Sequence, residues 1–145
     1  MASDFITETR REVLSILRGD PTITQTHGAK VYSAVVNKPE WPWLRWGEPS
    51  SVPLDSACVS GAIVSFTIHV FARERMTPGE FPQTAEDYCS DITAAVKHAL
   101  HLRKWGAADA SYRFRVQTSR LLRDPDDNRA FHGVVQVAAR VVAGR

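Results

Sequence analysis

Three aspartates and an asparagine lie close together near the C-terminus, within the segment RLLRDPDDNRAFHGVVQV (residues 120–137). Asp124, Asp126 and Asn128 alternate in the way that ligands alternate at the beginning of a calcium-binding loop. Such a loop also requires glycine at its sixth position and glutamate at its twelfth, where this chain has Arg129 and Val135. Because proline, aspartate and asparagine favour tight turns, we expect this segment to be the tip of a hairpin.

A second group of metal-binding residue types lies on a predicted helix. Asp87, Asp91, His98 and His101 share one polar stripe of this helix. Asp91 and His98 are separated by about 10 Å of helical rise, which is too far for one ion to bind both unless other elements contribute ligands. The stripe is typical of a solvent-exposed helix face, and we expect neither a metal nor a cofactor.

The residues that serve as nucleophiles or bases occur without the neighbours that catalysis requires. Neither Cys58 nor Cys89 lies beside a base, and Ser60 is not part of a G-x-S-x-G motif. The chain has no glycine-rich phosphate loop. His69 and His132 are single histidines on predicted strands, where a structural role is the simpler interpretation. We expect no catalytic residues and a protein that is not an enzyme.

Length and composition favour a single globular domain over residues 1–145. The hydrophobic content is 43% and the charged content is 23%, as in ordinary soluble proteins. The formal net charge of +2 is too small to indicate nucleic acid or an anionic membrane as the main partner. No basic and apolar leader begins the sequence and no apolar run approaches a membrane span, so we expect a protein that is made and kept in a cytoplasm or that leaves it inside something larger.

Two amphipathic helices are predicted. In the first, Ile6, Val13 and Leu17 share a face, Ser3 or Asp4 is expected to cap the beginning, and Gly19-Asp20-Pro21 ends it. In the second, Thr84 is the expected cap, with Asp87 three residues later. The buried stripe of the second helix is expected to contain Ala85, Tyr88, Cys89, Ile92, Val96 and Ala99.

Alternating apolar and polar residues predict the strands, most clearly in AIVSFTIHVFA (residues 62–72). A segment with several prolines precedes this strand and contains at most an edge strand. The predicted elements are helices at 4–18 and 84–103, strands at 30–36, 43–48, 62–72, 112–121 and 131–142, and a loop at 74–83. This order indicates an α+β fold, a mostly antiparallel sheet of about four to five strands with two helices on one side.

Two groups of residues are candidates for surface recognition. Trp41, Trp43 and Trp46 lie in one segment that prolines stiffen, where tryptophans either anchor an interface or cover the end of the core. Four arginines follow on the strand at 112–121 and just after it. Three interpretations are open for these arginines: a stripe that follows the phosphates of a nucleic acid, a solvent-exposed face of the sheet, or one half of ion pairs between subunits. These arginines are Arg113, Arg115, Arg120 and Arg123.

The chain resembles the tail-completion or tail-terminator proteins of long-tailed phages and gene transfer agents, which are also called head–tail joining proteins. The strongest similarity is a strand end of the type S-R-x-x-R-D-P-D followed by a strand of the type H-G-x-x-x-x-x-A. The residues that match are Ser119, Arg120, Arg123, Asp124, Pro125, Asp126, His132, Gly133 and Ala139. Weaker similarities lie at residues 30–32, 42–48 and 66–73, whereas the loop at 74–83 and Trp105 depart from the family pattern.

This resemblance implies a structural virion protein, located at the head–tail interface and assembled in the host cytoplasm. The family forms rings, usually of six subunits, that cap the tail tube at its set length and then join the head connector. The implied partners are further copies of the chain, the major tail tube protein and the connector, while DNA passes through the lumen without specific binding. The residues expected to contact subunits or the tube are Trp41, Trp43, Trp46, Arg73 and Arg75, with Arg120, Arg123, Asp124 and Asp126 bracing the hairpin or pairing across subunits.

Two other functions remain open from the residues alone. One is a small nucleic-acid-binding accessory protein that uses the arginine stripe between Arg113 and Arg123. The other is a metal-dependent hydrolase that uses the Asp and His stripe of the second helix. A steep loss of DNA affinity with salt distinguishes the first, and tightly bound metal distinguishes the second.

Overall fold

The computed structural model describes the chain except for residues 1–4, 55–59, 78, 108–109 and 144–145. Two α-helices and six strands account for most of the described residues, together with one short π-helix, η1. In chain order the elements are α1 (Ile6–Arg18), η1 (Thr22–Thr26), β1 (Lys30–Tyr32), β2 (Trp43–Pro53), β3 (Gly61–Arg73), α2 (Ala85–Leu100), β4 (Lys104–Ala107), β5 (Ala110–Arg123) and β6 (Ala130–Ala143).

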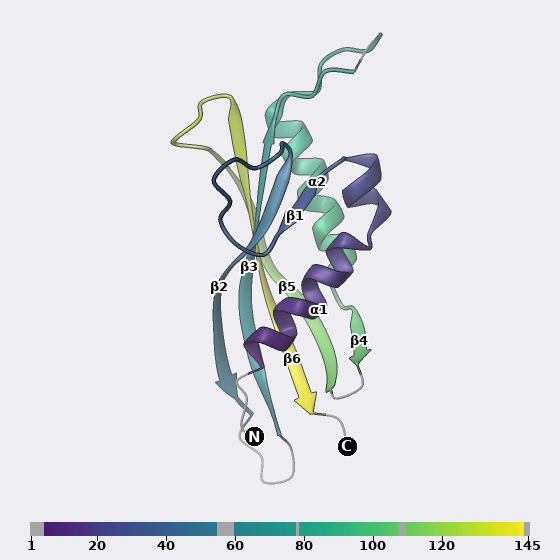
Figure 1. Ribbon diagram of the computed structural model, residues 1–145, viewed down its shortest axis with the longest axis vertical. Helices are drawn as coiled ribbons and strands as arrows, with labels where there is room; N and C mark the ends of the chain where they lie inside the picture. Colours follow the sequence, from purple (N-terminus) through teal and green to yellow (C-terminus); the bar gives the residue numbers. More distant parts are fainter. Residues whose placement is uncertain (1–4, 55–59, 78, 108–109, 144–145) are drawn as a thin grey trace.

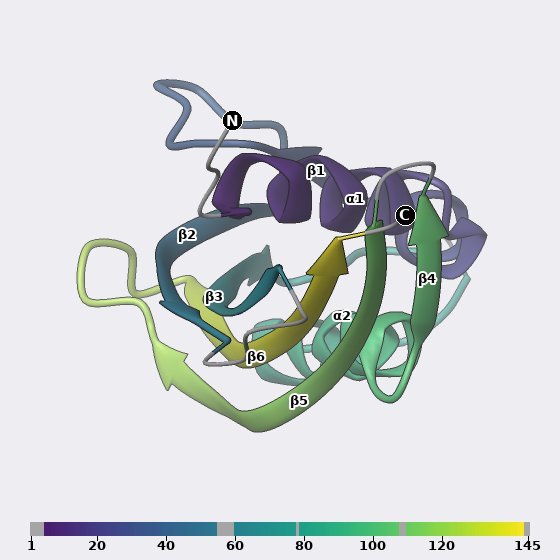
Figure 2. The same cartoon turned by 90° about the horizontal axis from the view of Figure 1, so that it is seen from below.

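The strands form one sheet in the order β1-β2-β3-β6-β5-β4 (Figure 1). β1 is parallel to β2, and every other neighbouring pair is antiparallel. The sheet curls around both helices, which therefore cover the same face (Figure 2). The α+β prediction, with a mostly antiparallel sheet and two helices on one side, is confirmed.

The core lies between the helices and the sheet. Alternate residues of β3 point to the helices and are fully or almost fully buried, among them Val64, Phe66 and Ile68. α2 packs closely across β3 and β6, and Gly133 of β6 lies at the point where the helix contacts the sheet. A Cβ atom at Gly133 would lie 2.4 Å from the Thr93 Oγ1 atom and 3.3 Å from the Cys89 Sγ atom. The absence of a side chain at Gly133 therefore permits the close approach of α2.

The predicted beginning of α2 is correct, whereas the predicted end lies too far along the chain. The Thr84 cap is confirmed, because its Oγ1 atom accepts a hydrogen bond of 3.1 Å from the backbone N–H of Asp87. The helix ends at Leu100, before the predicted position 103, and Leu102 has a φ of 58°. This left-handed residue turns the chain out of the helix and into β4, a short edge strand that the pattern does not predict.

The beginning of α1 also differs from the prediction. The helix begins at Ile6, and Phe5 occupies the cap position with a φ of 67° and without a side-chain hydrogen bond. The predicted caps, Ser3 and Asp4, lie outside the described residues. The end is as predicted, with Gly19 directly after the last helical residue.

The segment before β3 requires three corrections. The strand predicted at residues 30–36 ends at Tyr32, and the strand predicted at the edge is an interior one, because β1 pairs with it. β2 also extends to Pro53, well beyond residue 48. Pro49 is tolerated because a bulge between Gly47 and Ser50 removes it from the hydrogen-bond ladder. Among the described residues, no helix has the length and apolar character needed to cross a membrane.

Candidate assembly surface

One face of the sheet has no helix on it, and we call it the open face. The register places side chains on this face in rows across the strands, because directly opposite residues in antiparallel strands share a face. One row, at the end of the sheet where β2 begins and β3 ends, contains Trp43, Phe71 and His132. A row near the opposite end contains Arg113 and Arg140. The open face is therefore aromatic at one end and basic at the other.

The aromatic end is a stack of rings. The centroids of Trp43 and Phe71 are 4.1 Å apart, and those of Phe71 and His132 are 4.4 Å apart, with nearly parallel planes in both pairs. Trp41 contacts Trp43 edge-on, with the centroids 6.1 Å apart. Only 8% of Trp43 is exposed, and its indole N–H has no hydrogen-bond acceptor among the described residues. Aromatic rings of this kind are frequent anchors in protein interfaces.

Arg73 joins the aromatic stack to the tip of the β5–β6 hairpin. Its guanidinium carbon lies 4.1 Å from the ring centroid of Trp41. The Nε and Nη2 atoms donate hydrogen bonds of 2.9 and 2.6 Å to the same oxygen of Asp127. The N–H of Arg129 and the Arg73 guanidinium lower the pKa of Asp127, so this carboxylate stays ionised. Three segments distant in sequence are thus fixed relative to one another.

The acidic segment is the hairpin tip that its composition predicts. The Asp124 side chain accepts a hydrogen bond of 2.9 Å from the N–H of Asp126, which is an Asx-turn. The Asp127 side chain accepts one of 2.9 Å from the N–H of Arg129. Arg123 donates to the carbonyl of Asn128 over 3.3 Å, and its guanidinium lies 5.1 Å from the centroid of the Phe131 ring. These contacts hold the tip in one shape.

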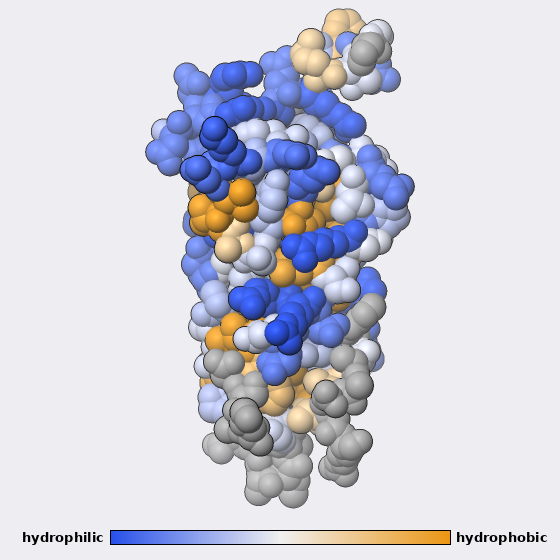
Figure 3. Space-filling view, in the orientation of Figure 1, coloured by the Kyte–Doolittle hydropathy of each residue, from blue (hydrophilic) through white to orange (hydrophobic). Residues whose placement is uncertain are grey.

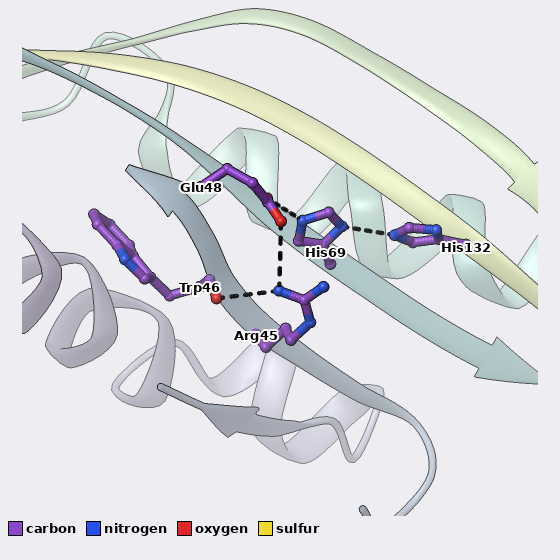
Figure 4. A network of polar contacts seen from close by, with 5 residues as sticks. All are labelled: Arg45, Trp46, Glu48, His69 and His132. Atoms are coloured by element: carbon purple, nitrogen blue, oxygen red, sulfur yellow. Dashed lines mark hydrogen bonds and ion pairs between the residues drawn. The ribbon is translucent and has the colours of Figure 1, made fainter. Parts of the chain in front are cut away.

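A chain of polar contacts crosses the open face beside the aromatic stack (Figure 4). The Nε2 atom of His69 lies 2.5 Å from Glu48, and the Nδ1 atom of His69 lies 2.7 Å from the Nε2 atom of His132. An ionised carboxylate can only accept, so His69 Nε2–H donates to Glu48. Arg45 lies 3.9 Å from the other oxygen of Glu48. The two histidines are therefore one hydrogen-bonded unit, although the sequence presents them as isolated.

The pKa of His132 is lowered to about 4, first by burial and then by the neighbouring His69. An unfolded chain binds a proton at this residue near pH 6.5 whereas the folded chain does not, so folding becomes less favourable as the pH falls from about 6.5 to 4. Over this pH range, we expect the free energy of unfolding of His132→Gln to fall by about 1–2 kcal/mol less than that of the wild type. This figure is reduced because the side chain is partly exposed to solvent. Denaturation across this pH range, with the exposed His98→Gln as the control, checks it. Equal pH dependence in both variants would contradict it.

The structure separates the residues that the sequence groups together. Trp41, Trp43 and Arg73 meet on the open face, next to the hairpin. Trp46 points the other way, is 5% exposed and stacks on Phe66 in the core, so for this residue the alternative of covering the core holds. Arg75 lies over the Tyr88 ring of α2, with 5.1 Å between its guanidinium carbon and the ring centroid.

The remaining candidates are surface residues. Arg113, Arg115 and Arg120 are exposed on β5, and Arg113 and Arg115 lie on the face opposite the buried Tyr112 and Phe114. The polar stripe of α2 is dispersed, since His101 accepts a hydrogen bond from the N–H of Val116 while Asp91 accepts one from Gln83. Within the described part of the chain, no group of three or more His, Cys, Asp or Glu residues could hold a metal ion.

The structure describes one of the two cysteines, Cys89. Cys89 is a free, buried thiol, and burial raises its pKa to about 11. A thiol with such a pKa is almost fully protonated at neutral pH and is a poor nucleophile. Cys58 lies outside the described residues.

A loop that projects from the molecule is a further candidate surface, which the sequence patterns do not predict. Residues 74–77 and 79–83 leave the body of the molecule at its upper end in Figure 1, and two backbone hydrogen bonds of 2.9 Å between Arg75 and Gln83 close the base. We call this segment the arm. Phe81 is 97% exposed and Met76 is 70% exposed, and apolar atoms are visible at the tip in Figure 3. A phenylalanine followed by proline in a polar loop is the signal that identifies it in the sequence.

Comparisons with known proteins agree with this fold. The model of the family described as "Tail completion protein gp17" matches residues 11–142. A solved chain from the "Virion of native gene transfer agent (GTA) particle" has a TM-score of 0.72 and 20% sequence identity, over 93% of this chain and 94% of that one. No curated protein matches significantly. Because the family model spans nearly the whole chain, the protein belongs to the tail completion protein gp17 family, whose members are structural proteins of the virion tail.

Proposed function

We propose that this protein caps the tail tube as a ring of six identical subunits, ends tail elongation and joins the tail to the head connector. Membership of the tail completion family is the observation that carries the proposal. The proposed partners are further copies of the chain, the major tail tube protein and the connector. The role is structural and involves no catalytic step.

An unpaired sheet edge supports association with other copies. β4 pairs with β5 only at residues 110–113, and no described strand pairs with the outer edge of β5 at residues 117–123. This edge contains no proline, whereas Pro49 and Pro53 interrupt the outer edge of β2. A free edge without proline is a template for a further strand or segment. In a closed ring, each subunit can cover this edge of its neighbour through a head-to-tail interface.

The aromatic stack, the β5–β6 hairpin and the arm supply contacts for the tube or the connector. The hairpin and the arm lie at the same end of the molecule (Figure 1), and Arg73 contacts both the hairpin and the stack. The hairpin and the stack are rigid because Arg73 links them, and the arm carries the most exposed aromatic side chain in the described part of the chain. Rigid anchors lose little conformational entropy on binding, which favours assembly at one defined end of a tube.

Electron microscopy of particles that lack this gene tests the proposal. Without a cap, subunits of the tube continue to add, and the tube end cannot join a filled head. We expect overlong tails beside separate heads that contain DNA. Tails of normal length joined to heads would contradict the proposal, and a nucleic-acid-binding role would then be favoured.

A further inference from the structure

The basic end of the open face contains three cations in one row. The register places Lys104 of β4 opposite Arg113 of β5, and Arg113 opposite Arg140 of β6. Neighbouring strands are about 4.8 Å apart, so the three side chains leave the sheet side by side on the same face. We call these three residues the basic row. Arg115 lies two residues further along β5 on the same face, about 7 Å away.

No carboxylate among the described residues neutralises the basic row. All three residues are exposed, and none takes part in the ion pairs between described residues, which involve Lys30, Arg45, His69 and Arg73. Like charges directly opposite each other on neighbouring strands destabilise a sheet. The arrangement therefore has an unfavourable energy in the isolated subunit, and binding of an anion would remove it.

The basic row borders a hollow. The next row of the open face is formed by Gly106, Ser111 and Val142, whose small side chains make the floor. A Cβ atom at Gly106 would have no atom within 4 Å, so the space above the floor is open. Ser111 places a hydroxyl beside the cations. Cations, a hydroxyl and accessible backbone are the groups with which proteins hold phosphate.

We propose that the basic row and its hollow bind the phosphate backbone of DNA that crosses the head–tail joint, without reading its sequence. This inference rests on the proposed function, which brings DNA past the subunit. A duplex presents one charge per about 1.7 Å of axis, so several phosphates lie within reach of Arg115 and the basic row at once. A protein partner is less suited to this end of the face, because Tyr112, the aromatic residue that lines the hollow, is only 4% exposed and packs in the core, where it offers little surface to an interface.

The small net charge of the whole chain does not oppose this proposal. Acidic residues lie away from the basic row, notably at the hairpin tip and along α2, where Glu86 and Asp87 lie in the first turn. Phosphate binding depends on the local cations, which are concentrated at one end of the open face. The contact would be weak for one subunit and would add over the six subunits of a ring.

A salt titration of purified full-length protein with a random-sequence duplex of about 30 base pairs tests the proposal. Fluorescence anisotropy between about 20 and 200 mM salt gives the slope of log affinity against log salt. The test variant carries Lys104→Ala, Arg113→Ala and Arg140→Ala. The control carries Arg11→Ala, Lys38→Ala and Lys97→Ala, which remove the same charge from exposed positions outside any described ion pair.

We expect the test variant to bind at least about tenfold more weakly than the control at low salt, with a slope smaller by about 2.7. Inorganic pyrophosphate should raise the melting temperature of the wild type and the control but not that of the test variant. The test variant should melt no lower than the wild type, because the like-charge repulsion is gone. This last measurement shows that lost binding is not lost folding.

Two results would overturn the proposal. These are equal binding of the duplex by the two variants, and no binding of the duplex by the wild type at the lowest salt. In the second case, stabilisation by pyrophosphate would show that the basic row binds an anion other than DNA. A failure of this inference can be distinguished from a failure of the proposed function, since overlong tails in the deletion with no DNA binding would support the cap and reject this inference alone.

Discussion

Gly133→Val is expected to lower the free energy of unfolding by about 3 kcal/mol or more, the largest effect of any single substitution considered for stability. Its first side-chain atom would lie 2.4 Å from Thr93 Oγ1 and 3.3 Å from both Cys89 Sγ and the Val70 Cβ atom. The two methyl groups of valine have no space between β6 and α2, so the helix must move away from the sheet. Chemical denaturation measures the loss directly.

Two further variants show whether this collision is the cause. Gly106→Val places the same side chain on a strand where no atom lies within 4 Å, and its stability should match the wild type within about 0.5 kcal/mol. Combining Gly133→Ala with Thr93→Ala removes the atom that is nearest to the new Cβ. This pair should be more stable than additivity of the two single substitutions predicts. Additive effects would mean that Thr93 is not the obstacle.

Phe81→Asp is expected to reduce the number of joined, infectious or transfer-competent particles about 100-fold, the effect of losing one central interface residue. The side chain is 97% exposed in the subunit, so its substitution removes no contact within the fold. Placing a charge at the tip of the arm instead prevents burial against a partner. Counting joined particles by electron microscopy, in a strain whose only copy carries the variant, measures the effect.

Val35→Asp is the matched control for the arm. Val35 is 74% exposed in the loop between β1 and β2, so both substitutions add one negative charge to an exposed apolar position. We expect the control to assemble as the wild type does, and both purified variants to unfold at the wild-type temperature. Equal assembly by Phe81→Asp and the wild type would remove the arm from the proposed contacts.

Local patterns predict the elements of this fold because the determinants are local. The period-two alternation in β3 places Val64, Phe66 and Ile68 on the core face, as expected. The Thr84 cap and the Asx-turn at Asp124 depend on residues two or three positions apart. The β4 strand is missed because four residues are too few to show a period, and a left-handed residue, Leu102, separates it from α2.

The candidate surface is less predictable because the strand register assembles it. His69 and His132 are 63 positions apart, and only the pairing of β3 with β6 brings them within 2.7 Å. Likewise, Lys104 and Arg140 lie in one row only because both are paired with Arg113 of the strand between them. The different positions of two tryptophans follow from the sequence, since Trp43 and Trp46 are three residues apart on one strand. An odd spacing places two strand residues on opposite faces, so the three tryptophans could not form one surface.

The distribution of tail lengths in particles that lack this gene tests the central claim most directly. A cap that stops elongation predicts a broad distribution that extends beyond the wild-type length, together with separate heads that contain DNA. Expression of the wild-type chain in the same cells should restore a single length and the joint. A single wild-type tail length without the gene would show that another component ends elongation, and it would contradict the assignment of this protein as the tail terminator.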